Sequence, residues 1–291
     1  MKDQLTWVVI AQEEGMTLLS FLRLRYSSKP SISVKALKSL VEAKCCTING
    51  RIETFSSHPL KKGDRVRLDT QEVKKQLSVA VLYEDEDLLI CNKSAGLVSD
   101  NRSFNQKLPQ YKGCLELVHR LDKETSGVII LAKNAKCKEL MMDLFAKREV
   151  HKAYMALVDG LIKGDSGRID SNIGLKRQYQ GRSVYQVVEK GKGQVALTFW
   201  KCIERRGAFS VLLCEPVTGR THQLRVHLSS IGHPILGDIE YGHHFRCPLK
   251  CKRHLLHAYS ISFVHPIKGA ELKVIAPVPL DIKESLVLCH A

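Results

Sequence analysis

Residues 119–127, HRLDKETSG, are followed directly by the apolar run VIILA at residues 128–132. A short apolar run bounded by turn-forming residues predicts a buried β-strand. Asp122 would then lie where a rigid sheet meets solvent, a position suited to holding a reactive group. A carboxylate can act as a nucleophile, and a neighbouring cation keeps it ionised. The simpler alternative is that Asp122 only caps a turn and pairs with Arg120.

Five further segments occur along the chain in a fixed order around this motif. They are LICNKSAGL (89–97), KAYMALVDG (152–160), VTGRTHQLRVHLSSIGHPILGDIEYG (217–242), RHLLHA (253–258) and FVHPIKG (263–269). Together with HRLD, these segments resemble the signatures of the RluA-type pseudouridine synthases, isomerases that convert uridine to pseudouridine in RNA. The resemblance covers roughly residues 78–280, and it implies an enzyme that needs no cofactor and no metal.

The resemblance places the essential aspartate of the family at Asp122. Whether that carboxylate attacks the sugar or removes a proton from it stays open, but either role requires an ionised side chain with a cation nearby. The family's paired arginine corresponds to Arg225, and Arg220 is the alternative. His222 and His227 flank Arg225, and for both a structural role is the default expectation.

Other parts of the motifs correspond to the family's substrate pocket. A target uridine inside structured RNA must be flipped out of its stack before it can react. By resemblance, Tyr154 stacks on the flipped base and assists proton removal, although a tyrosine in a strand is often only part of the core. Arg120 corresponds to a position that fills the place of the flipped base, Leu224 packs near the base, and Asn92 and Lys93 end a strand from which Lys93 reaches a phosphate.

The chain carries 45 Lys and Arg against 30 Asp and Glu, a formal net charge of +15 over 291 residues. This balance predicts a polyanionic partner. The charge is concentrated in residues 16–75, where 13 basic and 5 acidic side chains give a net charge of +8. A basic module of this kind is suited to phosphate contacts that weaken steeply as salt rises.

The basic N-terminal module has its own pattern of elements. Helices are predicted from Met16-Thr17 and from an N-cap at Ser33, with apolar faces formed by Leu18, Phe21, Leu22 and by Val34, Leu37, Leu40, Val41. Thr47–Ile52 predicts a strand, an Asn-Gly turn and a strand, and residues 60–68 predict a turn into another strand. The order resembles the S-four (αL-motif) RNA-binding domain. It implies phosphate contacts from Arg23, Arg25, Lys35, Lys38 and Lys44.

We expect an S-four-like domain over residues 1–70 (core about 16–68), a polar linker over 71–78 and a catalytic domain over 79–291. In the larger domain we predict strands at about 79–84, 88–93, 127–133, 153–159, 184–189, 194–201 and 208–214, helices at about 134–147 and 221–231, and a hairpin turning at 268–269. Many strands without strict βαβ alternation indicate an α+β fold with a mixed, mostly antiparallel sheet, preceded by a small α/β domain.

The sequence lacks the motifs that characterise several other classes of enzyme. The sequence contains no GxxxxGK[ST] loop, no HExxH and no HxE…PCxxC pattern. The segment from Cys247 through Cys251 and His254 to His257 has sterically possible zinc ligands, but spectator cysteines are the expected interpretation, and the resemblance implies a structural role for His257. No apolar run of 18 residues is present, and MKDQLTWVVIAQEEG does not resemble a signal peptide, so we expect no membrane association and a cytoplasmic protein.

Two hypotheses from different classes follow. The first is an active pseudouridine synthase on structured RNA, with ribosomal RNA of the large subunit favoured over tRNA because of the basic N-terminal module. The second is an RNA-binding or ribosome-assembly factor without catalysis, which the intact Asp122, Tyr154 and Arg225 disfavour. We expect a monomer that needs no protein partner. Ser94 replaces the family's usual proline, and the loop at 99–114 matches no motif, so substrate choice is not predicted in detail.

Overall fold

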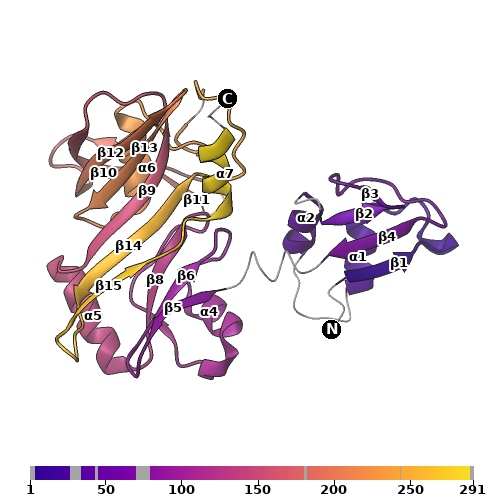
Figure 1. Cartoon of the computed structure of the whole chain (residues 1–291), viewed down its shortest axis with the longest axis horizontal. Coiled ribbons are helices and arrows are strands. Elements are labelled where there is room, and N and C mark those ends of the chain that lie inside the picture. Colours follow the sequence, from indigo (N-terminus) through magenta and orange to yellow (C-terminus); the bar gives the residue numbers. More distant parts are fainter. Residues whose placement is uncertain are drawn as a thin grey trace. The chain divides into compact units, whose positions relative to one another are not determined.

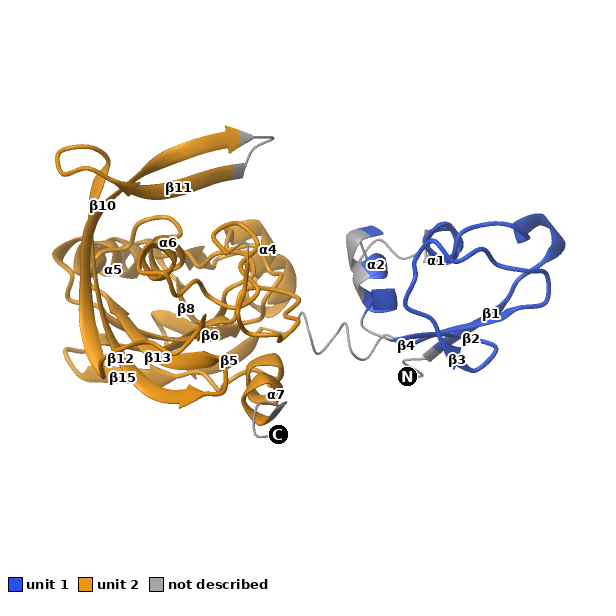
Figure 2. Ribbon diagram, turned by 90° about the horizontal axis from the view of Figure 1, so that it is seen from above, with its two compact units in different colours: residues 1–78 blue, residues 79–291 orange. Residues whose placement is uncertain are grey.

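The structure is a computed structural model that describes residues 4–26, 34–42, 45–69, 79–179, 182–242 and 244–288. The chain divides into two compact units, Met1–Ser78 and Val79–Ala291, which are coloured separately in Figure 2. The predicted linker at 71–78 and the predicted cap at Ser33 lie outside the described residues.

Unit 1 is a four-stranded antiparallel sheet with two helices packed on one face. The sheet has the order β1-β4-β2-β3. Its elements are β1 (Gln4–Val8), η1 (Ala11–Glu13), α1 (Leu18–Tyr26), α2 (Val34–Glu42), β2 (Cys46–Ile48), β3 (Arg51–Ile52) and β4 (Arg65–Asp69). Asn49 and Gly50 both have positive φ, 52° and 81°, as the predicted Asn-Gly hairpin turn requires.

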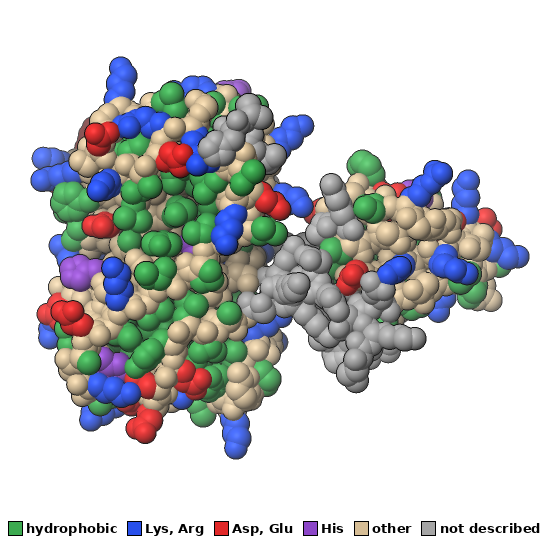
Figure 3. Space-filling view, in the orientation of Figure 1, with side chains coloured by type: hydrophobic (Ala, Val, Ile, Leu, Met, Phe, Trp, Pro, Cys, Tyr) green, Lys and Arg blue, Asp and Glu red, His purple; other side chains and the backbone are tan. Residues whose placement is uncertain are grey.

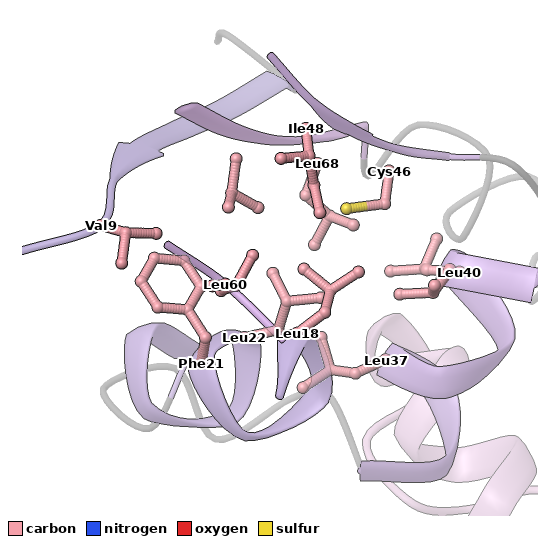
Figure 4. Packing of buried hydrophobic residues seen from close by; sticks show 12 residues of the cluster. Val9, Leu18, Phe21, Leu22, Leu37, Leu40, Cys46, Ile48, Leu60 and Leu68 are labelled. Carbon is pink, nitrogen blue, oxygen red and sulfur yellow. The ribbon is translucent and has the colours of Figure 1, made fainter. Parts of the chain in front are cut away.

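The core of unit 1 lies between this sheet and the two helices (Figure 4). Leu18, Phe21 and Leu22 are fully buried on the inner face of α1, as their helical spacing predicts. The predicted inner face of α2 is correct for its leucines and Val41, but Val34 is 43% exposed because it lies at the first position of the helix. Two sets of side chains at i, i+3 and i+4 therefore define this small core.

Unit 2 is built on one sheet of eleven strands (Figure 1). The order is β11-β10-β12-β13-β9-β14-β8-β6-β5, with β15 paired to β14 and β7 to β8. The strands are β5 (Ala80–Glu84), β6 (Leu88–Lys93), β7 (Glu116–Leu117), β8 (Ser126–Ala132), β9 (His151–Asp159), β10 (Ser166–Tyr179), β11 (Arg182–Val188), β12 (Gln194–Arg206), β13 (Phe209–Pro216), β14 (Leu256–Val264) and β15 (Glu271–Ile275). All the pairs are antiparallel except β8 with β14, so the predicted fold class is confirmed.

The described helices of unit 2 are α4 (Asn101–Lys107), the short 3-10 helix η2 (Pro109–Tyr111), α5 (Ala135–Lys147), α6 (Gln223–Ser230) and α7 (Leu280–Leu288). Among the described residues, no helix is long and apolar enough to span a membrane. α5 confirms the helix predicted at 134–147, and Asn134 caps it by accepting a hydrogen bond from the Cys137 amide. α6 begins later than predicted, because His222 rather than Thr221 is the N-cap, with a left-handed backbone (φ 57°).

Some elements were not predicted from the sequence: β1, β7, β10, α4 and α7. β10 is the longest strand of the described chain, and its sequence SGRIDSNIGLKRQY is mostly polar. β10 is a strand because it pairs with β12 along its first half and with β11 along its second half, not because of its own apolar content. Figure 2 shows that β11 and the second half of β10 extend from the body of unit 2 as a two-stranded arm on the side of α6.

β8 is the centre of unit 2, and all seven of its residues are buried. Val128 and Ile130 pack in the cluster that includes α5, whereas Ile129 and Leu131 pack in the cluster that includes α4. This double burial explains the continuous apolar run at 128–132.

On the face that carries α7, shown in Figure 3, apolar side chains cover much of the middle and basic side chains project mainly from the edges.

Gly127 is required where β8 meets β14. Its φ is +116°, and a Cβ atom there would lie 2.1 Å from the carbonyl oxygen of Ala258. We expect Gly127→Ala to lower the free energy of unfolding by about 3 kcal/mol or more, because backbone strain and the clash add. Gly191→Ala is the matched control, since Gly191 has φ +90° with no atom within 4 Å. Its expected cost is about 1 kcal/mol, and equal urea midpoints for the two variants would contradict the argument.

Candidate active site

Asp122 lies in the turn that leads into β8. The carbonyl of Asp122 accepts a hydrogen bond from the Thr125 amide at 3.0 Å, which closes the turn. Leu121, next to it, is bound at both its amide and its carbonyl by the hydroxyl of Ser99. The carboxylate itself is 26% exposed, so it is accessible to a substrate while its backbone is held on both sides.

Lys93 at the end of β6 also stabilises this turn. The prediction that Lys93 reaches a phosphate is wrong. The side chain is completely buried, so it is not placed to reach a phosphate. Its ammonium donates to the carbonyls of Leu97 (2.9 Å), Lys123 (3.0 Å) and Ser94 (3.2 Å), and it thereby joins the loop after β6 to the loop of Asp122. Burial lowers the pKa of Lys93 to about 7. Asn92, one position earlier, is half-buried in the strand.

We expect Lys93→Met to destabilise unit 2 by about 3 kcal/mol, because buried carbonyls lose their donor. The folded pKa of Lys93 lies below the unfolded one, so between pH 7 and about 10 the unfolded chain binds the additional proton. Wild-type stability therefore rises with pH in this window relative to the variant. Urea unfolding of both proteins at several pH values measures this, and a difference that shrinks with rising pH would contradict it.

Arg225 is the cation next to Asp122. Its Nη1 lies 3.3 Å from Asp122 Oδ2. The same guanidinium binds Asp238 through two atoms, Nε to Oδ2 at 2.7 Å and Nη2 to Oδ1 at 2.9 Å, and Nη2 also donates to Glu240 at 2.5 Å. Its carbon Cζ lies 4.8 Å from the centre of the Tyr241 ring. Asp238, Glu240 and Tyr241 thus fix the guanidinium in an orientation that directs Nη1 at Asp122.

The buried pair of Arg225 and Asp238 keeps both groups ionised. Burial acts to lower the pKa of Arg225, but the hydrogen bonds and charge of Asp238 outweigh it and the pKa is raised. Burial acts to raise the pKa of Asp238, and the hydrogen bonds from Arg225 reverse this and lower it. A fixed positive charge therefore stands beside Asp122 over the ordinary pH range.

His222 borders Asp122 on another side. Its Nε2 lies 3.8 Å from Asp122 Oδ2, and its Nδ1 lies 2.7 Å from the hydroxyl of Tyr241. The backbone amide of Tyr185 donates to that same hydroxyl at 3.0 Å, which leaves the Tyr241 proton free to donate to Nδ1. Burial lowers the pKa of His222 against the opposing charge of Asp122, so the ring is inferred to be neutral with its proton on Nε2.

Tyr154 and Leu224 belong to one apolar cluster of unit 2, and Tyr154 lies near enough to Asp122 for the carboxylate charge to act on its hydroxyl. Tyr154 lies on β9 between Cys214 and Ala258 of the adjacent strands, and it packs against two apolar clusters. Burial and then the charge of Asp122 raise the pKa of Tyr154, so its hydroxyl stays protonated. Leu224 is 6% exposed at the start of α6, next to Arg225 in sequence.

In the described part of the chain, Arg120 and Arg220, the two other arginines considered for the site, form no ion pair with Asp122. Arg120 is exposed, and among the described residues it has no ion pair, so the alternative pairing of Asp122 with Arg120 is not found. Arg220 donates from Nε to the carbonyl of Val195 at 3.1 Å. Of the two arginines considered as partners of Asp122, the structure brings Arg225 to it.

The predicted RNA contacts of unit 1 lie in different environments. Arg23 is exposed on α1. Arg25 is bound to Glu13 at 2.8 Å and lies over the ring of Phe21, so its charge is partly compensated. Lys38 is exposed and lies 3.8 Å from Glu42. The side chain of Lys35 and the whole of Lys44 lie outside the described residues.

The histidines of the RHLLHA segment have structural partners. His254 Nε2 lies 2.9 Å from the Thr125 hydroxyl, and His257 Nδ1 lies 2.9 Å from the Ser126 hydroxyl, so both histidines support the turn that carries Asp122. Burial lowers the pKa of His254 to about 3 and that of His257 to about 4. Among the described residues, no group of three or more His, Cys, Asp or Glu is arranged to hold a metal ion.

Three residues of the site were missed from the sequence. Asp238, Glu240 and Tyr241 all lie in the matched segment GHPILGDIEYG, where they could have been singled out as a polar cluster inside an apolar motif. What the sequence does not give is the bidentate contact of Asp238 with Arg225 across 13 positions. Gly237, next to Asp238, allows the backbone of Arg253 to pass close to this segment, because a Cβ atom at position 237 would lie 2.1 Å from the Arg253 carbonyl oxygen.

The chain is similar to known proteins over most of its length. The family model described as RNA pseudouridylate synthase matches residues 87–230. An uncharacterized RNA pseudouridine synthase of Aquifex aeolicus is 35% identical over 82% of this chain and 84% of its own. Ribosomal large subunit pseudouridine synthase C of Buchnera aphidicola is 35% identical (79% and 81%), and ribosomal large subunit pseudouridine synthase D of Xylella fastidiosa is 32% identical (75% and 71%).

The fold agrees with these sequence relatives. The structure of human RNA pseudouridylate synthase domain containing 4 superposes with a TM-score of 0.61 at 28% identity, over 72% of this chain and 93% of the human one. Human RNA pseudouridylate synthase domain containing 1 gives 0.60 at 26% identity, over 74% and 96%. Sequence and fold agree, and the chain belongs to the RNA pseudouridylate synthase family, whose members are isomerases.

Proposed function

We propose that this protein isomerises specific uridines of large-subunit ribosomal RNA to pseudouridine, with Asp122 as the essential group. The observation that carries the proposal is the accessible Asp122 carboxylate beside the buried and fully oriented Arg225 guanidinium. Arg225 supplies a fixed cation beside the carboxylate, and the turn held by the Thr125 amide and the Ser99 hydroxyl fixes the backbone on both sides of it.

The reaction needs no group beyond the chain and its substrate. The bond between N1 of uracil and C1′ of ribose breaks, the base rotates, and C5 bonds to C1′; the proton of C5 is lost and N1 gains one. Ionised Asp122 is suited either to attack C1′ or to remove a sugar proton. In either mechanism, attack on C1′ or removal of a sugar proton, Arg225 orients the Asp122 carboxylate.

Residues near Asp122 are proposed to bind the flipped base and to fill the space that it leaves in the RNA. Tyr154 presents an aromatic ring and a protonated hydroxyl near Asp122, and it is proposed to stack on uracil and to assist exchange of the C5 proton. Leu224, buried in the same apolar cluster as Tyr154, is proposed to pack near the base. Arg120, exposed and free of ion pairs among the described residues, is proposed to fill the space that the flipped base leaves.

The choice of ribosomal RNA rests on two arguments. Several relatives are named ribosomal large subunit pseudouridine synthase C or D. Unit 1 is proposed to be an S-four-like RNA-binding domain joined by a linker to the catalytic domain, with phosphate contacts from Arg23, Arg25, Lys35, Lys38 and Lys44. We further propose a monomer that acts in the cytoplasm without a required protein partner.

Pseudouridine mapping of total RNA tests the proposal. A strain deleted for the gene is complemented with the wild-type protein, with Asp122→Asn or with an empty vector. We expect one or a few pseudouridines of large-subunit RNA to be lost in the deletion and restored by the wild-type protein alone. Loss of tRNA sites would redirect the substrate assignment. Restoration by Asp122→Asn would remove Asp122 from the chemistry and favour a non-catalytic assembly role.

A further inference from the structure

A cavity of about 300 Å³ opens beside the site, between the two-stranded arm and the segment that precedes α6. Leu175 of β10 and Tyr185 of β11 contribute from the arm, Gln194 from the start of β12, and Arg220 with Thr221 from the loop before α6. The arm passes on the α6 side of the sheet (Figure 2). The cavity is therefore formed by segments that are far apart in the sequence and that the sheet brings together.

Its walls have the chemistry of a nucleotide site. Leu175 and Tyr185 are directly opposite each other in the pairing of β10 with β11, so their side chains share one face of the arm, and Leu175 is 53% exposed. An aromatic ring beside an aliphatic side chain suits a stacked base. Arg220 uses Nε for the Val195 carbonyl and, among the described residues, meets no carboxylate, which leaves its Nη atoms for a phosphate. Gln194 and Thr221 add exposed polar groups.

His222 connects Tyr185, a lining residue of the cavity, to the reacting carboxylate. His222 packs edge-on against the Tyr185 ring with 5.8 Å between centres, and its Nε2 lies 3.8 Å from Asp122. The backbone of Tyr185 is also tied to the site, because its amide donates to the Tyr241 hydroxyl that holds His222. A nucleotide in the cavity would therefore lie one residue's width from a uridine at Asp122.

We propose that this cavity binds the nucleotide adjacent to the target uridine in the RNA chain, with its base on Tyr185 and its phosphate on Arg220. The inference rests on the proposed function and extends it from the target base to its neighbour. It makes the arm a determinant of which uridine is chosen, because an RNA whose neighbouring base cannot enter the cavity would not present its uridine to Asp122.

The test uses the full-length protein and a stem-loop RNA carrying the uridine mapped in the deletion strain. We expect Tyr185→Leu to raise KM about tenfold with kcat changed by less than about threefold, as for loss of one stacked base. Tyr185→Phe keeps the ring and should stay near the wild type. Arg220→Met should also raise KM, whereas the exposed Arg177→Met, on the same arm, is the control for simple loss of charge.

An RNA lacking the base on one side of the target completes the test. Removing the base that occupies the cavity should raise the wild-type KM about tenfold and should add less than about twofold to Tyr185→Leu, because both changes remove one contact. If the wild-type protein makes no pseudouridine, the proposed function fails. If it is active but Tyr185→Leu and the abasic RNAs all stay within twofold of the wild-type KM, the cavity proposal alone is overturned. If Tyr185→Leu has a lower melting temperature than the wild type, the cavity proposal is tested instead by the KM of Arg220→Met and by the KM of the wild-type protein on the abasic RNAs.

Discussion

Purified Asp122→Asn protein is expected to form pseudouridine at least about 10⁴-fold more slowly than the wild type while it keeps its fold. Asparagine has the shape of aspartate and still offers an oxygen to Arg225 Nη1, 3.3 Å from the present carboxylate. It has no negative charge, however, so it can neither attack ribose nor accept a proton. The rate is measured under single-turnover conditions on the mapped stem-loop RNA.

The stability of this variant is the control for its activity. The Asp122 side chain is 26% exposed, and Arg225 keeps Asp238 and Glu240 when the charge of Asp122 is removed. We therefore expect a melting temperature within about 2 °C of the wild type and unchanged affinity for the RNA. Activity within 100-fold of the wild type in a folded variant would show that the carboxylate is not essential.

The sequence alone predicts the parts of this fold whose cause is local. The apolar run after HRLDKETSG identifies β8, and the spacing of Leu18, Phe21 and Leu22 identifies the inner face of α1. Asn49-Gly50 specifies its turn, because only such residues adopt positive φ at low cost. In each case a stretch of fewer than ten residues contains the whole physical reason.

The unpredicted parts depend on contacts between distant segments. β10 is polar and pairs with two neighbours that follow it in the chain, so its own periodicity does not reveal it. Lys93 looks like a surface cation, yet three carbonyls from two loops surround it. The motif correctly directs attention to Arg225, but the carboxylates that orient its guanidinium become apparent only in three dimensions.

Arg225→Met is the variant for which we expect both stability and activity to fall strongly. Asp238 is 1% exposed, and the two-point contact from Arg225 is the ion pair that compensates its burial. Removing one partner of a buried pair leaves an uncompensated charge, and the expected loss in unfolding free energy is about 4 kcal/mol. Glu240 also loses its partner, but it is 26% exposed and water can solvate it.

The pH dependence of stability and a second substitution separate the loss of stability in Arg225→Met from its loss of activity. In the wild type the pKa of Asp238 is lowered, so its stabilising contribution is present above the ordinary carboxyl range and is lost as the pH falls through the folded pKa. Without Arg225, burial raises the pKa of Asp238 against the weaker opposing effects of His254 and the Glu240 amide. The deficit of Arg225→Met should therefore shrink from pH 7 toward about pH 4. Arg225→Met with Asp238→Leu removes the buried charge and should recover most of the stability. It should recover none of the activity, because the guanidinium that orients Asp122 is still missing. Recovery of pseudouridine formation in the folded double variant would mean that Arg225 acts only on stability.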